Sequence, residues 1–311
     1  MTIRDCAAFL RERDGFLLLT HSRPDGDTLC SASALCSALR RLGKTAALYP
    51  NPEITERYKD MTAPYMGESG TEGACVVSVD TAGVRMLPLG FSGRVELAID
   101  HHASNEFYAE QSLVMGKKAA CGEIVLELIE ELCGSVTKEE ADLLYAAVST
   151  DTGCFCYANT NADTLRAAAR LLDLGAENGR LNKLLFRSFS YARLRLEGMV
   201  YAGLRSYRDH QINIAVVTLD MMERSGATEN DCDDLASLAG KVQGSVVAIT
   251  VRELEKGRCK VSVRTNELVN ASAVCALFGG GGHSMAAGCT LDAGPEETAE
   301  KMLAAVEEIW K

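Results

Sequence analysis

Residues 16–27 read FLLLTHSRPDGD, and this stretch decides the fold. Its apolar start, residues 16–20, is predicted to be a buried strand, and a helical pattern begins soon after, at Leu29. Pro24 and Gly26 favour a turn between the two elements. A strand that leads through a polar turn into a helix is typical of an open α/β sheet, in which ligand sites lie beyond the carboxyl ends of the strands. In the simplest alternative, Asp27 only caps the helix.

Short apolar runs and helical patterns continue to alternate through the first half of the chain. Residues 45–49, 75–79 and 95–99 are predicted strands, and residues 29–42 are the first predicted helix. Strands that alternate with helices in this way predict a parallel, doubly wound sheet.

The second half of the chain follows a different pattern. Residues 123–205 are mainly helical, and strand-like runs alternate with helices beyond residue 210. The expected fold class is therefore α/β, with an N-terminal doubly wound parallel-sheet domain, a helical linker and a smaller C-terminal α/β domain. We expect these three parts at residues 1–187, 188–210 and 211–311.

Metal-ligand side chains gather where predicted elements end. Taken singly, each cluster also fits an ordinary turn or a helix cap. Because the carboxyl ends of parallel strands meet at one edge of a sheet, we expect several of these side chains to converge. They are His21, Asp25, Asp27, Asp80, Asp100, His101, His102 and Asp151.

Carboxylates that converge at one sheet edge repel one another, and this raises their pKa values unless cations offset the charge. Two divalent metal ions would offset it. Imidazole and carboxylate donors without a thiolate favour Mn²⁺, with Mg²⁺, Fe²⁺ and Zn²⁺ as alternatives. A pair of such ions serves in-line displacement at phosphorus. The sequence therefore predicts a two-metal centre that acts on phosphate esters.

A run of four glycines precedes a histidine in the second half of the chain. Residues 278–283 read FGGGGH, between a helical pattern and a strand-like run. Consecutive glycines let backbone N–H groups approach and cradle an anion, and His283 adds a donor. The alternative is a flexible linker. The run lacks the G-x-G-x-x-G spacing of a dinucleotide fingerprint.

Composition limits the class of protein. The 311 residues carry a net charge of −11, which argues against a general binder of long nucleic acid. The longest apolar runs fall short of the ~18 residues that a membrane span needs, and a charged N-terminus does not resemble a signal peptide. We therefore expect a cytoplasmic protein with no membrane partner, and twelve reduced, mostly buried cysteines.

Five motifs in this order resemble the DHH–DHHA1 phosphoesterases, and among them the nanoRNase type. Their spread covers most of the chain, and the length matches a member without extra domains. One such motif would be weak support, whereas five in sequence are specific. They are HSRPDGD at 21–27, VSVD at 77–80, DHHASN at 100–105, STDTG at 149–153 and GGGH at 280–283.

The resemblance implies a role for each candidate metal ligand. His21 and Asp25 would bind one metal ion. Asp27, His101 and Asp151 would bind the other, and Asp80 would bridge the two. Asp100 would orient a ligand from behind, and His102 would face the substrate phosphate as a candidate general acid.

The resemblance also implies the substrate and its binding residues. Gly281, Gly282, His283 and, on a weaker match, Arg264 would hold the nucleotide. The reaction would be hydrolysis of short oligoribonucleotides to nucleoside monophosphates, and of pAp to AMP and phosphate. Long duplex nucleic acid is not an expected partner, and a homodimer is expected from the resemblance alone. The alternatives are a linear or cyclic dinucleotide phosphodiesterase and, in a different class, a non-catalytic nucleotide-binding module.

Overall fold

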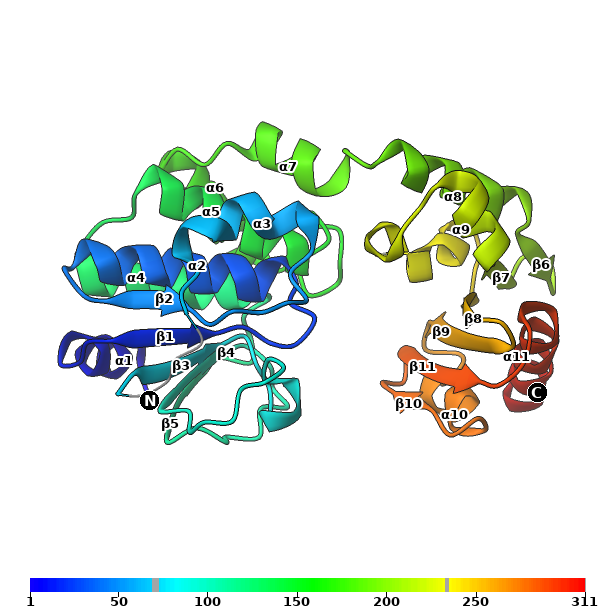
Figure 1. The fold of residues 1–311 in the computed structure, drawn as a ribbon, viewed down its shortest axis with the longest axis horizontal. Coiled ribbons are helices and arrows are strands. Elements are labelled where there is room, and N and C mark those ends of the chain that lie inside the picture. Colours follow the sequence, from blue (N-terminus) through cyan, green and yellow to red (C-terminus); the bar gives the residue numbers. More distant parts are fainter. Residues whose placement is uncertain (69–72, 233–234, 311) are drawn as a thin grey trace. The chain divides into compact units, whose positions relative to one another are not determined.

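The computed structural model describes residues 1–68, 73–232 and 235–310. The chain forms two compact units, Met1–Ser188 and Phe189–Lys311, and each has its own hydrophobic cores (Figure 1).

A five-stranded sheet organises the first unit. Every neighbouring pair of strands is parallel, and their order along the sheet is β2-β1-β3-β4-β5. This order is one of the two common doubly wound arrangements, so the predicted fold class is confirmed. The strands are β1 (Phe16–Leu19), β2 (Ala46–Leu48), β3 (Cys75–Val79), β4 (Leu97–Asp100) and β5 (Gln111–Val114).

The main core of the first unit lies between one sheet face and its helices. Alternate residues of β1 face two different cores, Phe16 and Leu18 toward the helices and Leu17 and Leu19 toward the opposite face. Loop residues such as Phe91 cover that opposite face. The helices of this unit are α1 (Ile3–Arg11), α2 (Gly26–Arg41), α3 (Glu56–Thr62), α4 (Cys121–Cys133), α5 (Lys138–Asp151), α6 (Ala162–Asp173) and α7 (Asn178–Phe186), with short 3₁₀ turns η1 (Ala63–Tyr65) and η2 (Val84–Met86).

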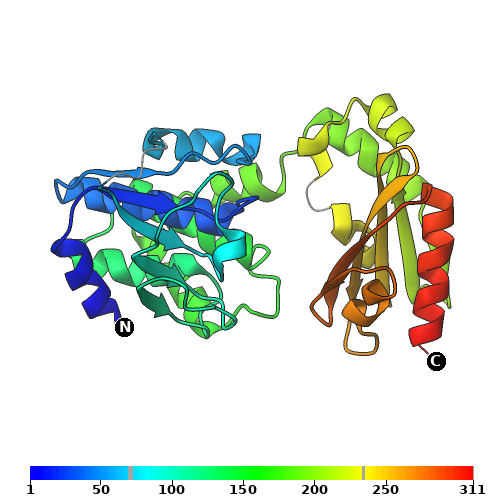
Figure 2. The same ribbon diagram turned by 60° about the horizontal axis from the view of Figure 1, so that its bottom comes forward.

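The second unit is built on a six-stranded mixed sheet with the order β10-β11-β9-β8-β7-β6. Within the described residues, β7 and β8 form its one parallel pair. Helix α11 lies beside the sheet in both views (Figures 1 and 2). The strands are β6 (Arg205–Tyr207), β7 (Ile212–Val217), β8 (Val247–Glu255), β9 (Arg258–Thr265), β10 (Gly281–Gly282) and β11 (Ala286–Leu291). The helices are α8 (Tyr191–Ala202), α9 (Leu219–Ser225), α10 (Ala271–Ala276) and α11 (Pro295–Ile309), with η3 (Glu229–Cys232) and η4 (Leu235–Lys241).

All twelve cysteines are free thiols, and eight of them are buried. Among the described residues, no helix has the length and apolar character required to cross a membrane.

Candidate metal centre

The turn after β1 places two carboxylates at the start of α2. Asp25 is the N-cap of the helix, and its side chain accepts hydrogen bonds from the backbone N–H groups of Asp27 at 3.0 Å and Thr28 at 3.2 Å. This cap starts the helix at Gly26, three residues before the predicted start at Leu29. Asp25, rather than Asp27, therefore caps the helix, and the side chain of Asp27 is available for another role.

Asp27 is fully buried against the N-terminus of α4. Its carboxylate accepts hydrogen bonds from the N–H groups of Cys121 at 2.6 Å and Gly122 at 2.9 Å, and from Ser31 Oγ at 3.0 Å. The helix terminus stabilises the negative charge. Burial and the nearby carboxylates of Asp80 and Asp151 nevertheless raise the pKa of Asp27 well above its ordinary value.

Two histidines are held by backbone carbonyls so that their other ring nitrogen is available. His21 Nδ1 lies 2.8 Å from the carbonyl oxygen of Ser22, and His101 Nδ1 lies 3.1 Å from that of Lys118. Because a carbonyl only accepts hydrogen bonds, Nδ1 carries the proton in both rings. Histidines that bind metals are oriented in this way, with the second nitrogen directed at the ion.

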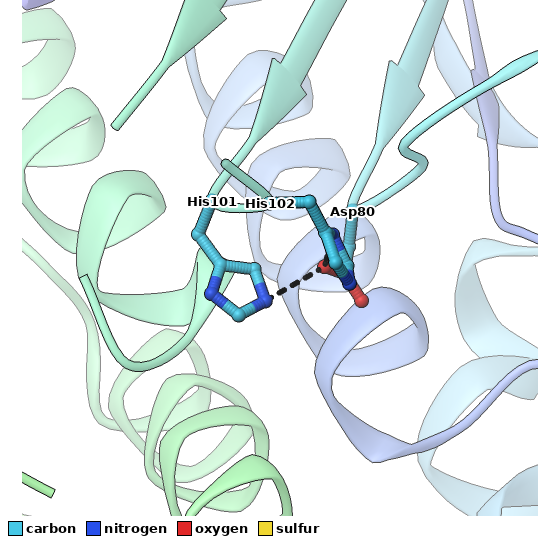
Figure 3. Close-up of side chains that lie close together, drawn as sticks. All are labelled: Asp80, His101 and His102. Atoms are coloured by element: carbon cyan, nitrogen blue, oxygen red, sulfur yellow. Dashed lines mark ion pairs between the residues drawn. The ribbon is translucent and has the colours of Figure 1, made fainter. Parts of the chain in front are cut away.

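Asp80 lies between these two histidines, at the end of β3. Its Oδ2 is 3.8 Å from His21 Nε2, and its Oδ1 is 3.3 Å from His101 Nε2. Figure 3 shows the His101 ring directed at the Asp80 carboxylate. The backbone of Asp80 has a φ of +57°, a left-handed conformation that a non-glycine residue rarely adopts and that is concentrated at functional sites.

Three overlapping groups of side chains could each hold a cation. Within each group, the donor atoms lie within 4.8 Å of one another. His101 also approaches Asp151 Oδ2 at 3.7 Å and Asp27 Oδ2 at 3.9 Å, and His21 approaches Asp25 Oδ1 at 3.5 Å. The structure thus brings all six predicted ligands into one cluster. The groups are His21, Asp25 and Asp80; Asp27, His101 and Asp151; and Asp80, His101 and His102.

Asp100 is buried behind His102 and fixes its ring. One oxygen of Asp100 accepts from His102 Nδ1 at 2.7 Å, and the other accepts from Asn105 Nδ2 at 2.6 Å. Burial opposes ionisation of Asp100, but hydrogen bonds from His102 and Asn105 outweigh it and lower its pKa. The same contact with Asp100 raises the pKa of His102, whose side chain is 35% exposed.

The charges of this cluster fit bound cations. Burial alone would lower the pKa of both histidines, yet the carboxylates around them raise that of His21 to about 9 and that of His101 to about 10. Burial raises the pKa of Asp151 to about 6, with the charge of Asp80 adding to the rise and that of His101 opposing it. Asp80 Oδ1 is buried without a hydrogen-bond partner in the described chain. An uncompensated buried oxygen among imidazole and carboxylate donors fits divalent metal ions.

The glycine run forms a tight hairpin rather than a flexible linker. Gly281 and Gly282 pair with β11, and the N–H of His283 donates to Ala286 O at 2.8 Å. Gly282 has a φ of +144°, and a Cβ there would lie 2.6 Å from Ala286 O, so only glycine fits. Arg264 in β9 pairs in register with Ala286, so the predicted substrate-binding residues lie near one end of this sheet.

The structure shows residues that support the metal centre and that we did not predict from the sequence. Thr28 Oγ1 receives the N–H of His21 and donates to Val79 O, which ties the first turn to β3. Asn105 donates to Asp100, and its place in the DHHASN motif was the available signal. The contact of Asp27 with the start of α4 spans 94 residues of sequence and has no local signal.

The two halves of the chain each match a family model. Residues 16–148 match the DHH family, N-terminal domain, and residues 211–311 match the DHHA1 domain. The chain belongs to the DHH–DHHA1 family. It is therefore a phosphoesterase, as predicted, and family membership together with the acidic and histidine clusters implies the use of divalent metal.

Relatives of this DHH–DHHA1 protein cover nearly its full length. It is 36% identical to the bifunctional oligoribonuclease and PAP phosphatase NrnA of Thermus thermophilus, over 94% of this chain and 89% of that protein. It is 25% identical to the protein of the same name from Bacillus subtilis, over 96% of this chain and 95% of that protein. An exopolyphosphatase-related protein from Bacteroides fragilis has the same fold, with a TM-score of 0.88, 22% identity and coverage of 98% and 96% of the two chains.

Proposed function

We propose that this phosphoesterase hydrolyses short oligoribonucleotides to nucleoside monophosphates, and pAp to AMP and phosphate. The observation that carries the proposal is the single cluster in which Asp80 and His101 are each shared by two ligand groups. The names of the relatives that match over most of this chain support the choice of substrate.

The proposed metal ligands follow the grouping of the side chains. His21 and Asp25 would hold one cation, Asp27, His101 and Asp151 the other, and Asp80 both. When bound, the two cations supply Lewis acidity toward the phosphoryl oxygens and lower the pKa of a water molecule at the centre. We propose Mn²⁺ as the native ion because the donor set includes imidazoles.

His102 is the proposed general acid. Its Nδ1 is bound to Asp100, so Nε2 is the atom that would donate a proton to the leaving oxygen. The hydrogen bond with Asp100 raises the pKa of His102, which favours the protonated ring that this role requires. Arg264, Gly281, Gly282 and His283 of the second unit would bind the phosphate or sugar of the substrate. A cytoplasmic location and a homodimer belong to the proposal, to be checked by fractionation and light scattering.

Product identification with different substrates tests the proposal. Labelled RNA from dinucleotide to pentanucleotide, a long RNA, pAp and pyrophosphate are incubated with the protein and Mn²⁺ or Mg²⁺. We expect the short RNAs and pAp to be hydrolysed fastest, with Mn²⁺ ahead of Mg²⁺. Preferred cleavage of long RNA or of pyrophosphate would contradict the substrate class, and full activity in excess chelator with no metal detected would contradict the metal centre.

A further inference from the structure

Pockets that bind small ligands commonly have volumes of about 300–1,000 Å³, and the first unit has a pocket of about 530 Å³ that includes Cys154, in the turn after α5. One side of it is the face of α7 formed by Gly179, Asn182, Lys183 and Phe186. These positions are three, four and seven residues from the first, which is the spacing of one helix face. Arg187, at the end of α7, and Cys154 complete the lining.

The charge of this pocket is positive in a protein whose net charge is −11. Lys183 and Arg187 are exposed, and neither forms an ion pair within the described part of the chain. None of the residues that line the pocket is acidic. Two cations without a carboxylate partner at the rim of a hollow favour an anionic ligand, and a phosphate group satisfies both.

One further side chain of the pocket suits a nucleotide rather than a bare anion. Phe186 is half-buried and offers an aromatic surface on which a base can stack. Asn182 donates to Tyr145 Oη at 3.2 Å, while its Oδ1 is buried without a hydrogen-bond partner among the described residues. That oxygen is shielded from solvent, so Phe186 is the side chain that favours a nucleotide in this pocket.

The pocket is tied to the metal centre by a short, fixed turn. Cys154 follows Asp151 by three residues, so their Cα atoms are at most about 11 Å apart. Gly153, Cys154 and Phe155 all have a positive φ, between 55° and 66°. Cys154 N–H donates to Ser149 O at 2.7 Å, which holds the turn against α5.

We infer that this pocket is a subsite of the phosphoesterase that binds the nucleotide next to the scissile phosphate, with its phosphate on Lys183 and Arg187 and its base against Phe186. The inference rests on the proposed function, because it assumes a substrate with a second nucleotide. It assigns part of substrate recognition to the first unit, in addition to the role proposed for the hairpin of the second.

Kinetics with a matched control test the subsite. The double variant Lys183→Gln/Arg187→Gln is compared with Arg4→Gln/Lys256→Gln, which removes the same charge from exposed positions elsewhere. We expect the first variant to lose about 10-fold in kcat/KM on a trinucleotide, as for a lost charge-assisted contact. It should keep its metal content and its rate on bis-p-nitrophenyl phosphate, and the control should match wild type. Unchanged trinucleotide kinetics would overturn the inference.

Alkylation of Cys154 tests the subsite without turnover. Wild-type protein is treated with iodoacetamide with and without AMP, and modified thiols are assigned by peptide fragmentation. We expect AMP to protect Cys154 in wild type but not in Lys183→Gln/Arg187→Gln, while the exposed Cys156 reacts equally throughout. No protection by AMP, or equal protection by inorganic phosphate, would overturn the nucleotide subsite. If protection held while wild type cleaved no oligoribonucleotide, the proposed function would fail and the nucleotide site would stand.

Discussion

Asp80 Oδ1 and His101 Nε2 approach to 3.3 Å, yet the buried Oδ1 has no hydrogen-bond partner in the described chain. Once His101 Nε2 has lost its proton, both of these ligand atoms have a lone pair available for a cation. A buried carboxylate oxygen without a partner is costly, so the fold maintains an arrangement that a bound ion would stabilise. Asp80 therefore belongs both to the ligand group of His21 and to that of His101, and it contributes its negative charge to each.

Replacement of Asp80 tests its proposed bridging role. We expect Asp80→Asn to lose bound metal and to reduce turnover by more than about 100-fold, since even partners behind metal ligands contribute about 10- to 100-fold. In excess chelator its melting temperature should not exceed that of wild type, because the protonated His21 and His101 lose a carboxylate partner. Metal analysis, kinetics and thermal unfolding measure these effects.

The control for Asp80 is Asp60→Asn, which neutralises an exposed carboxylate on α3. It should keep wild-type metal content and activity. If Asp80→Asn retained two metal ions and full turnover, the bridging assignment would be wrong.

Metal binding should release protons from the two histidines. Without metal, His21 has a pKa of about 9 and His101 of about 10, so both rings are protonated at pH 7. A metal binds only the neutral imidazole, so binding displaces these protons, and affinity rises with pH until the rings are already neutral. Calorimetric titration with Mn²⁺ in two buffers of different ionisation enthalpy measures the release. An observed enthalpy that is independent of the buffer would contradict it.

Much of the first unit was predictable because its signals are local. The apolar run 75–79 was predicted as a strand with the bounds that β3 has, and the ligand clusters were recognised because they directly follow such runs. Helix α2 starts earlier than predicted because Asp25, and not Asp27, caps it. Both residues are acidic, so only the backbone conformation shows which of them is the cap.

Other features depend on contacts that sequence patterns do not reveal. Strand β5 was not predicted, because its burial pattern has one fully buried residue, Leu113, and its place follows from pairing with β4. The left-handed backbone conformation of Asp80 also arises from tertiary packing, as do the hydrogen bonds between Asp27 and the N-terminus of α4. Sequence thus predicted which side chains converge, whereas their orientation needed the structure.

The close approach of Gly26 to Thr150 gives another prediction. A Cβ at Gly26 would lie 2.9 Å from Thr150 Cβ and closer still to its hydroxyl and methyl. Thr150 precedes Asp151, so Gly26→Ala should displace that ligand, weaken metal binding and destabilise the fold by about 1–3 kcal/mol. Adding Thr150→Ala should restore part of the stability and metal content, as measured by chemical unfolding and metal analysis. Equal loss in the single and double variants would show that this contact is not the cause.

His283 distinguishes substrate binding from metal binding. Its side chain is exposed and its ring can donate a hydrogen bond, and the three ligand groups found in the described chain all lie in the first unit. Binding energy from a remote contact can align the scissile phosphate and so raise turnover. We expect His283→Ala to lower kcat/KM for dinucleotides and pAp by about 10- to 150-fold, the effect of one charge-assisted contact of about 1.5–3 kcal/mol.

A small activated ester separates this role from a catalytic one. His283→Ala should keep its metal content and should lose much less activity on bis-p-nitrophenyl phosphate, because that ester cannot use the contact fully. His210→Ala, which removes an exposed imidazole from the same unit, serves as the control and should behave as wild type on all three substrates. An equal loss of His283→Ala on every substrate, accompanied by loss of metal, would place His283 among the metal ligands and would overturn the proposed division of roles between the two units.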